Sequence, residues 1–415
     1  MKALYYTVIL IACSVQGIYA QQSVSVQQAI DNTLANNYSI RIAKESAQQA
    51  SIANSYTMTG ALPNVQISGN LLPVDFSNST AFSSESQHMV QVSIPLFNGL
   101  HVISSKQQLE ALQQQGEIAL TITIQNAIAL VLQHYYDLVR QQYYTSILET
   151  SLDVAQERLH IVTTRQSVGL ANDADVLQAS IDLRSIEQNI SQQKTIIAQS
   201  KSELLLQMGI KEHIDIQVTD SITFGILPPY ETLIGKLEQN PQLLSAQLAN
   251  TIAQTAIQQI QAKRYPSVQL FGSYTSIFSA SDSYANQTMA GISYVIPIYS
   301  RGTYKTQQAV AQSKLNISLI EQERIRHELT THMHQTYTAY EQNMLQLQKQ
   351  IDTYEYSKQL LHVIMKRFES NMATMLEVKA AQLSFEQSGY MLANQRYAVK
   401  MAEIELLRIL CEIGI

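Results

Sequence analysis

The chain contains no tryptophan and few of the residues that normally break, cross-link or charge a fold. Among its 415 residues are only 14 glycines and 8 prolines, which favours long uninterrupted helices. Its 2 cysteines, Cys13 and Cys411, are too few for a disulfide-rich scaffold. Charged residues make up 14% of the chain, the net charge is -6, and lysine and arginine form no cluster. This composition argues against a nucleic-acid partner.

The sequence also lacks the motifs of the common enzyme classes. It contains no phosphate-binding loop, no nucleophile elbow and no cysteine cluster. The segment His327–His332 resembles a zinc-protease motif but is one residue too long, which places its two histidines about 140° apart on a helix. The repeat-related His160 and His362 are expected on a polar helix surface. We therefore predict no catalytic residues, no metal site and no cofactor.

The N-terminus has the pattern of a secretory signal peptide. Lys2 precedes a short apolar stretch, and Ile18-Tyr19-Ala20 is an acceptable cleavage site before Gln21. An alternative is lipidation at Cys13, because the preceding residues resemble a lipobox. The apolar stretch is shorter than the about 20 residues that a membrane-spanning helix needs. Export without such a helix leaves a periplasmic or secreted protein, or a β-structure in the outer membrane.

The most informative feature is an internal duplication with a period near 200 residues. Residues 63–69 (PNVQISG) return as 266–272 (PSVQLFG), 203 positions later, and 93–97 (SIPLF) return as 295–299 (VIPIY), 202 positions later. Such a long period indicates duplication of a whole structural unit rather than a solenoid. We predict a signal peptide at 1–20, one repeat at 21–210, a linker at 211–229 and a second repeat at 230–415.

Each repeat is expected to hold long helices. Their predicted ranges are 24–60, with a kink at Asn36-Asn37, then 101–168, 173–208, 230–263, 303–370 and 374–410. A helix of nearly 70 residues is about 100 Å long at 1.5 Å per residue. It cannot fold around one globular core, so it must pack sideways against other helices as in a coiled coil.

Each repeat also holds two expected strands, at 63–76 and 90–95 and at 267–279 and 288–299. Their length and alternation match transmembrane β-strands. Nine apolar residues are predicted to face lipid: Val65, Ile67, Val90, Val92, Ile94, Val268, Leu270, Ile292 and Tyr294.

Four strands cannot close a barrel, for which about eight are needed. Open edges in lipid would leave backbone groups unpaired, so other copies must complete the barrel, and three copies would supply 12 strands. The alternatives are an ordinary sheet on a helical protein and a soluble periplasmic coiled-coil structural protein.

The ordered set of motifs, present twice, resembles the TolC family of outer-membrane efflux proteins. The first copy has 165–171 (RQSVGLA) and 175–179 (DVLQA), and the second has 367–373 (RFESNMA) and 377–381 (EVKAA). The resemblance implies a mainly α homotrimer, with four strands per protomer in a 12-stranded outer-membrane β-barrel continuous with a long periplasmic α-helical barrel. It also implies a passive duct for small molecules, with an inner-membrane pump and a periplasmic adaptor as partners. Type I protein secretion and metal efflux are alternatives, and the cargo, pump and adaptor are left open.

The helix turns at 168–175 and 370–377 are expected at the periplasmic end. In a trimer, Asp173, Asp175, Glu377 and Glu369 would each form a ring of three negative charges at the pore constriction, which favours cations. For Asp173 and Asp175 the alternative role is helix capping, because acidic residues suit the first turn of a helix.

The resemblance also places residues where well-studied members of the family lock this end with hydrogen bonds. Phe368, Ala373 and Ala174 occupy three of those positions beside Asp175, and their side chains cannot form such bonds. We therefore expect closure by packing or by other pairs.

Overall fold

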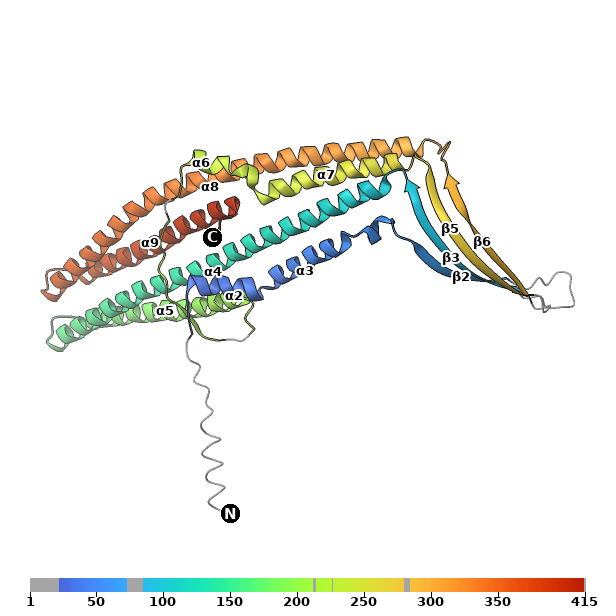
Figure 1. Cartoon of the computed structure of the whole chain (residues 1–415). Helices are drawn as coiled ribbons and strands as arrows, with labels where there is room; N and C mark the ends of the chain where they lie inside the picture. The colour runs from blue at the N-terminus through green and yellow to red at the C-terminus, as the bar shows by residue number, and fades with distance from the viewer. Residues whose placement is uncertain (1–21, 73–84, 212–213, 226, 280–283, 414–415) are drawn as a thin grey trace, which may run out of the picture. The chain divides into compact units, whose positions relative to one another are not determined.

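Figure 1 shows the computed structural model of the chain, which describes residues 22–72, 85–211, 214–225, 227–279 and 284–413. The expected signal peptide and Cys13 lie outside these residues. The chain divides into two compact units, each described here by itself. Unit 1 comprises Met1–Arg41, Thr123–Leu237 and Leu329–Ile415, and unit 2 comprises Ile42–Ile122 and Glu238–Glu328.

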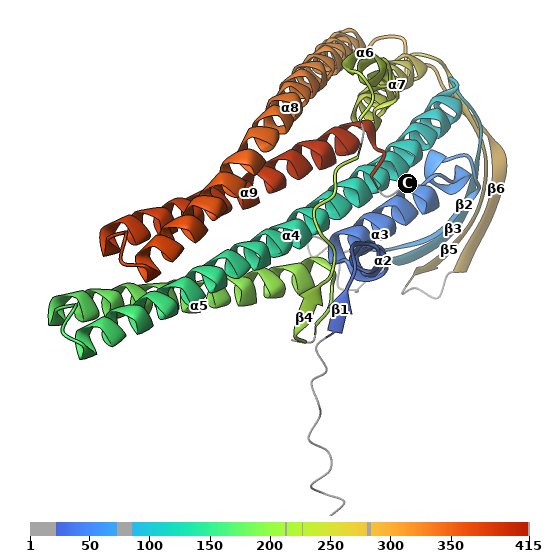
Figure 2. The ribbon, with the colours of Figure 1, turned by 90° about the vertical axis from the view of Figure 1, so that its left-hand side faces the viewer.

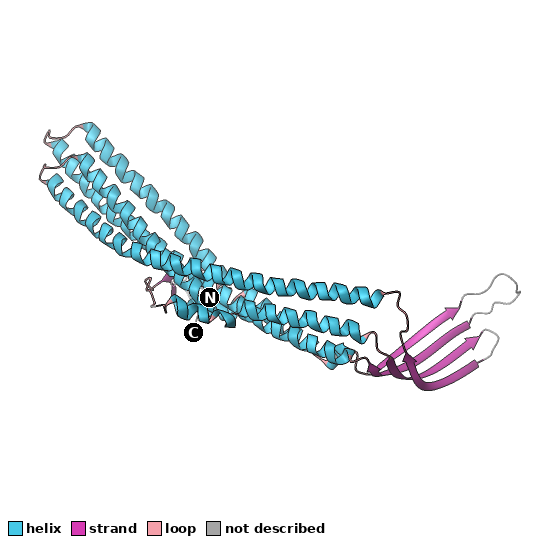
Figure 3. Cartoon of the chain, turned by 90° about the horizontal axis from the view of Figure 1, so that it is seen from above, coloured by secondary structure: helices cyan, strands magenta, loops and turns pink. Residues whose placement is uncertain are grey.

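The described residues are mainly helical, with one four-stranded sheet and one short strand pair (Figure 3). In the first half of the chain the elements are β1 (Gln22–Val24), α2 (Val26–Asn36), α3 (Tyr38–Ala53), the 3-10 helix η1 (Tyr56–Thr59), β2 (Asn64–Leu72), β3 (Glu85–Asn98), α4 (His101–Ser167) and α5 (Asp173–Gln207). The second half holds β4 (Ile216–Val218), α6 (Tyr230–Gly235), the 3-10 helix η2 (Leu237–Gln239), α7 (Pro241–Ala262), β5 (Ser267–Ser279), β6 (Tyr284–Val295), α8 (Thr303–Glu369) and α9 (Met375–Leu410).

The two long helices confirm the duplication. α4 and α8 each have 67 residues, and their first residues are 202 positions apart. Two consecutive left-handed residues precede each helix, Gly99-Leu100 and Arg301-Gly302. Among the described helices, α4 alone holds a stretch long and apolar enough by composition to cross a membrane. Because core helices have the same composition, this stretch does not by itself assign a membrane span.

Two of the helices predicted from the sequence are divided in the structure, one of them at the expected place. The kink expected at Asn36-Asn37 is present as a break between α2 and α3, where Asn37 Oδ1 accepts a hydrogen bond of 2.8 Å from the Ser39 N–H. The single helix expected at 230–263 is instead divided into α6, η2 and α7. Pro241 explains the division, because it lacks an N–H and is accommodated at the first position of α7, behind the N-cap Asn240.

The sheet of unit 2 has the order β2-β3-β5-β6, and all its neighbours are antiparallel. β2 and β6 are therefore its two edges. The strand predicted at 288–299 is found at Tyr284–Val295, so it begins and ends earlier. It begins earlier because Tyr284 pairs with Phe278, and it ends at Val295 because Val295 pairs with Ser267, the first residue of β5, so that the neighbouring strand goes no further.

The core of unit 1 gathers residues from both ends of the chain. β1 pairs with β4 in parallel, as Figure 2 shows, and both lie against α4. The hydroxyl of the buried Tyr135 is 2.6 Å from Asp220 Oδ2, and the same carboxylate oxygen accepts a 2.7 Å hydrogen bond from the Val26 N–H at the start of α2. This carboxylate thus ties α4 to the first helix of the described chain.

A close backbone contact at the end of α5 leads to the first prediction. Gly209 and Gly169 both have a positive φ, of 71° and 78°. A Cβ on Gly209 would lie 2.5 Å from the Asn36 carbonyl oxygen, whereas a Cβ on Gly169 would meet nothing within 4 Å. We expect Gly169→Ala to lower the free energy of unfolding by about 1–2 kcal/mol, from backbone strain alone, and Gly209→Ala by about 3–4 kcal/mol. Thermal unfolding of the two variants, followed by circular dichroism, checks the ranking, and equal losses would contradict it.

Candidate functional site

The two helix turns of unit 1 have the same backbone design. At the end of α4 the Leu170 N–H donates to the Arg165 carbonyl at 2.8 Å, and at the end of α8 the Met372 N–H donates to the Arg367 carbonyl at 2.7 Å. Each turn needs one left-handed residue, which is Gly169 in the first and Asn371 in the second. Asparagine tolerates this conformation, so the second turn closes without glycine.

Capping boxes start both returning helices. Asn172 and Asp175 cap α5, and Thr374 and Glu377 cap α9, with each side chain bonded to the other residue's backbone N–H. Hydrogen bonds from the Thr374 backbone and side chain, helped by the charge of Arg367, hold the pKa of the exposed Glu377 carboxyl below its usual value. The stability that this cap contributes is present above the usual pKa of a glutamate and is lost as the pH falls through the lowered pKa.

The predicted acidic residues do not all lie together. Asp175 and Glu377 line one hollow of about 450 Å³ between the two turns, together with Arg165. Asp173 is exposed and accepts a 2.7 Å hydrogen bond from Gln166, and Glu369 is exposed at the last position of α8. The two turns therefore bring one carboxylate from each repeat to a shared site.

The three residues predicted to pack at the turns also differ in burial. Phe368 is only 2% exposed and belongs to the hydrophobic cluster beneath the turns. Ala373 packs against that cluster, whereas Ala174 is exposed. Arg165 stacks over the Phe368 ring, with 4.5 Å from its guanidinium carbon to the ring centroid, and its Nη2 donates to the Phe368 carbonyl. This pair joins the end of α4 to the end of α8.

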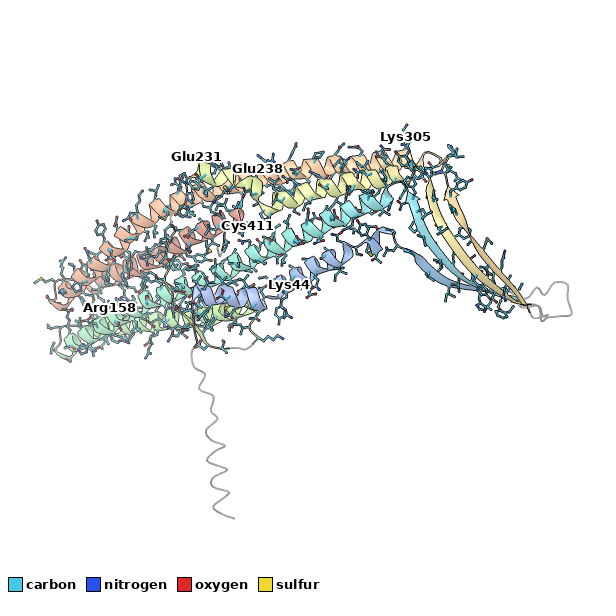
Figure 4. The ribbon with its side chains drawn as sticks, in the orientation of Figure 1. Lys44, Arg158, Glu231, Glu238, Lys305 and Cys411 are labelled. Atoms are coloured by element: carbon cyan, nitrogen blue, oxygen red, sulfur yellow. The ribbon has the colours of Figure 1, made fainter. Side chains whose placement is uncertain are left out.

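A buried ion cluster lies deeper between the same helices. Figure 4 labels Arg158 on α4, which is 1% exposed and lies 3.1 Å from Asp182 Oδ2 on α5. Lys379 Nζ on α9 approaches Asp182 Oδ1 at 2.7 Å. Burial lowers the pKa of Arg158, while Asp182 and Glu386 act in the opposite direction. The Asp182 carboxylate thus forms ion pairs with cationic side chains from two different helices.

The roles of Arg165 and of this cluster were not predicted from the sequence. Arg165 stood in a repeated motif, but nothing in the motif assigned it a contact. A signal for the cluster does exist, because the duplication places Leu360 at the counterpart of Arg158 and Ser384 at the counterpart of Asp182. A charge that is present in one repeat and absent from the other marks a contact specific to that repeat.

The sheet forms the second candidate site, because its register gathers apolar side chains on one face. Val65 pairs with Val92, Ile67 with Val90, and Leu270 with both Ile94 and Ile292. With Val268 opposite Tyr294, all nine residues predicted to face lipid share this face. The opposite face is richer in polar side chains, such as the Gln66–Gln91 pair, whose amides are 3.3 Å apart.

Charge is nearly absent from the sheet. β2, β5 and β6 contain no Asp, Glu, Lys or Arg, and β3 contains only its first residue, Glu85. The strands have 9, 14, 13 and 12 residues, whereas about 9–11 tilted residues cross a bilayer. An apolar, uncharged face of this length suits contact with hydrocarbon.

The buried ion cluster leads to the second prediction. Asp182→Ala leaves Arg158 buried without its nearest carboxylate, so we expect a loss of about 3–5 kcal/mol in the free energy of unfolding. Glu187→Ala, on the same helix, breaks the solvent-exposed pair with Arg184 and should cost at most about 0.5 kcal/mol. Chemical denaturation of both variants measures the difference, and similar midpoints would refute the buried pairing.

The comparisons with known proteins agree with this geometry. CusC, solved in work on folding and transmembrane channel formation, has a TM-score of 0.78 at 20% identity, over 93% of this chain and 91% of that chain. The outer membrane protein VceC of Vibrio cholerae has a TM-score of 0.76 at 16% identity, over 92% and 95%. The MtrE outer membrane channel of Neisseria gonorrhoeae, in an open state, has a TM-score of 0.76 at 17% identity, over 93% and 88%.

No curated protein matches the chain. The sequence model described as "Outer membrane efflux protein" matches residues 29–209 and 235–412, one segment for each copy of the duplication. These two segments make up most of the chain, and the family expected from the repeated motifs is confirmed. The protein belongs to the outer membrane efflux protein family.

Proposed function

We propose that three copies of this chain form the outer-membrane exit duct of a tripartite efflux system. The observation that carries the proposal is the four-stranded sheet, with one apolar, uncharged face and two free edges. Four strands are too few to enclose a lumen, and about eight are the practical minimum. Three sheets supply twelve strands, which leaves a water-filled interior lined by the more polar face and an exterior in contact with outer-membrane lipid.

The helices extend the duct into the periplasm. α4 and α8, with 67 residues each, are about 100 Å long at 1.5 Å per residue. Packed side by side in three copies, they form a helical barrel that continues the β-barrel. The hairpin turns at 168–172 and 370–374 then lie at its periplasmic end, where a periplasmic adaptor protein and an inner-membrane pump deliver cargo.

The turns provide the constriction of this duct. Asp175 and Glu377 line the hollow between them, and in a trimer each becomes a ring of three carboxylates, with Asp173 and Glu369 contributing further charge nearby. Such rings attract cations and repel anions. The packing of Phe368 and Ala373 and the stacking of Arg165 on Phe368 hold the turns together, whereas the exposed Ala174 adds no packing.

The duct is passive and conducts small molecules, and the partner pump supplies the energy. The partners are therefore two further copies of this chain, the adaptor, the pump and outer-membrane lipid, with no nucleic acid. The apolar face of the sheet and the family membership support this assignment. Selectivity among small molecules then resides mainly in the pump.

The charge of the constriction is tested by Asp175→Asn. The amide keeps an oxygen for the capping box but removes one ring of charges, so we expect the ratio of cation to anion permeability to fall by roughly a factor of two or more, with little change in drug tolerance. Single-channel recordings in planar bilayers measure this ratio. Glu187→Gln, away from the turns, is the matched control. An unchanged ratio in the Asp175 variant would count against the ring.

The efflux role is tested in a strain that lacks the gene. We expect the minimum inhibitory concentrations of dyes and bile salts to fall severalfold, because the pump then has no exit through the outer membrane, and the intact gene on a plasmid should restore them. The same strain is compared for metal tolerance and for secreted proteins. Normal tolerance of dyes and bile salts, with a defect only in metals or in protein secretion, would reject small-molecule export.

A further inference from the structure

The two edges of the sheet are related to interior strands by the duplication. The repeat relates β6 to β3 with an offset of 202 positions, and it relates β2 to β5 with an offset of 203. β3 and β5 are the central neighbours of the sheet, whereas β6 and β2 each lack a partner on one side in a single chain. The pairing of β3 with β5 therefore serves as a template for how β6 and β2 would pair with strands of another copy.

The hydrogen-bonding register obeys the duplication. In the first hairpin Asn64 pairs with Ser93, and in the second Ser267 pairs with Val295. The offset of 203 takes residue 64 to 267, and the offset of 202 takes residue 93 to 295, so the first pair predicts the second. The two hairpins are thus equivalent residue by residue, so the junction between β3 and β5 can be transferred to the edges.

The β3–β5 junction carries a local irregularity that makes the template specific. Val92 pairs with Gly272, Ile94 with Leu270 and, after a shift in register between Pro95 and Phe97, Phe97 with Val268. Leu96 is the extra residue at this bulge. Its counterpart in the second repeat is Ile298, which is 94% exposed.

We propose that β6 of one copy pairs with β2 of a second copy in the register of the β3–β5 junction. Moving that junction by the two offsets places Tyr294 opposite Gly69 of the second copy, Ile296 opposite its Ile67 and, beyond a bulge at Ile298, Tyr299 opposite its Val65. The segment from 296 to 300 then becomes the last part of β6. The proposal rests on the proposed function, since the second copy belongs to the trimer, and it adds the residue register of the seam.

The side chains agree with this register. Within one chain, Ile292 and Tyr294 share the apolar face of the sheet with Ile67 and Gly69. In the proposed register these residues stay on one continuous face across the seam, whereas a slip by one residue would turn the apolar residues of one copy toward the lumen. The seam also contains no charged residue, so no like charges oppose each other.

The pairing of tyrosine with glycine has a parallel inside the chain. Phe271 and Gly291 are partners across β5 and β6, and a Cβ on Gly291 would lie 3.3 Å from the Phe271 ring. The ring thus covers a glycine of the neighbouring strand, an arrangement that compensates for the missing side chain. Tyr294 is 71% exposed at the β6 edge and is placed to cover Gly69 of the second copy in the same way.

Cysteine cross-linking between full-length chains in the outer membrane tests the register. In a Cys411→Gly background, Ile296→Cys is combined with Ile67→Cys as the matched pair, and with Val65→Cys or Leu71→Cys as pairs displaced along the same face. Directly opposed residues have Cα atoms about 4.5–5.5 Å apart, within reach of a disulfide, whereas displaced pairs lie about 7–8 Å or more apart. We therefore expect the matched pair to form reducible dimers and trimers about tenfold faster than either displaced pair.

The outcomes separate the register from the trimer. Faster cross-linking of a displaced pair overturns the register and leaves the trimer standing. If no pair cross-links while an amine-reactive reagent still gives trimers, the β6–β2 seam is wrong. If the detergent-purified protein is monomeric by light scattering as well, the proposed function fails together with the seam. Each single-cysteine chain is the control for chance collisions.

Discussion

The constraint on which the rest depends is that a backbone N–H or C=O group cannot remain unpaired in hydrocarbon, where it costs several kcal/mol. A sheet with an apolar outer face and two free edges is therefore incomplete as a single chain. In the proposed trimer the strands gain neighbours from other copies, and the long helices of the three copies pack together beyond the membrane.

The duplication distinguishes two kinds of contact: those that occur in both repeats and those that occur in one repeat alone. Equivalent turns and caps recur in both repeats, as Asn172 with Asp175 and Thr374 with Glu377 show. Contacts that differ between the repeats, such as the approach of Lys379 on α9 to Asp182 on α5, join helices from both hairpins of unit 1. The symmetric features thus build the scaffold, and the asymmetric ones specify how its two halves fit together.

Much of the fold could be predicted from the sequence because its signals are local. The scarcity of glycine and proline predicted α4 and α8, and the alternation of residues such as Val65 and Ile67 predicted strands. The break at Pro241 was missed because a helical pattern continues on both sides of it, although proline is favourable only at the start of a helix.

The candidate site was less predictable, because it depends on contacts between distant segments. The caps follow from residue type and spacing, so Asp175 and Glu377 could be placed at the turns. The stacking of Arg165 on Phe368, and the approach of Lys379 to Asp182, join residues about 200 positions apart. No local sequence pattern specifies which faces of two such distant helices contact each other.

The sheet's two unlike edges also have a genetic consequence. In the proposed trimer, a copy with a damaged β6 but an intact β2 would still pair with a normal neighbour and then leave the ring open. Defective alleles of this kind are therefore expected to act dominantly when expressed beside the normal gene, whereas alleles that prevent the chain from folding are expected to be recessive.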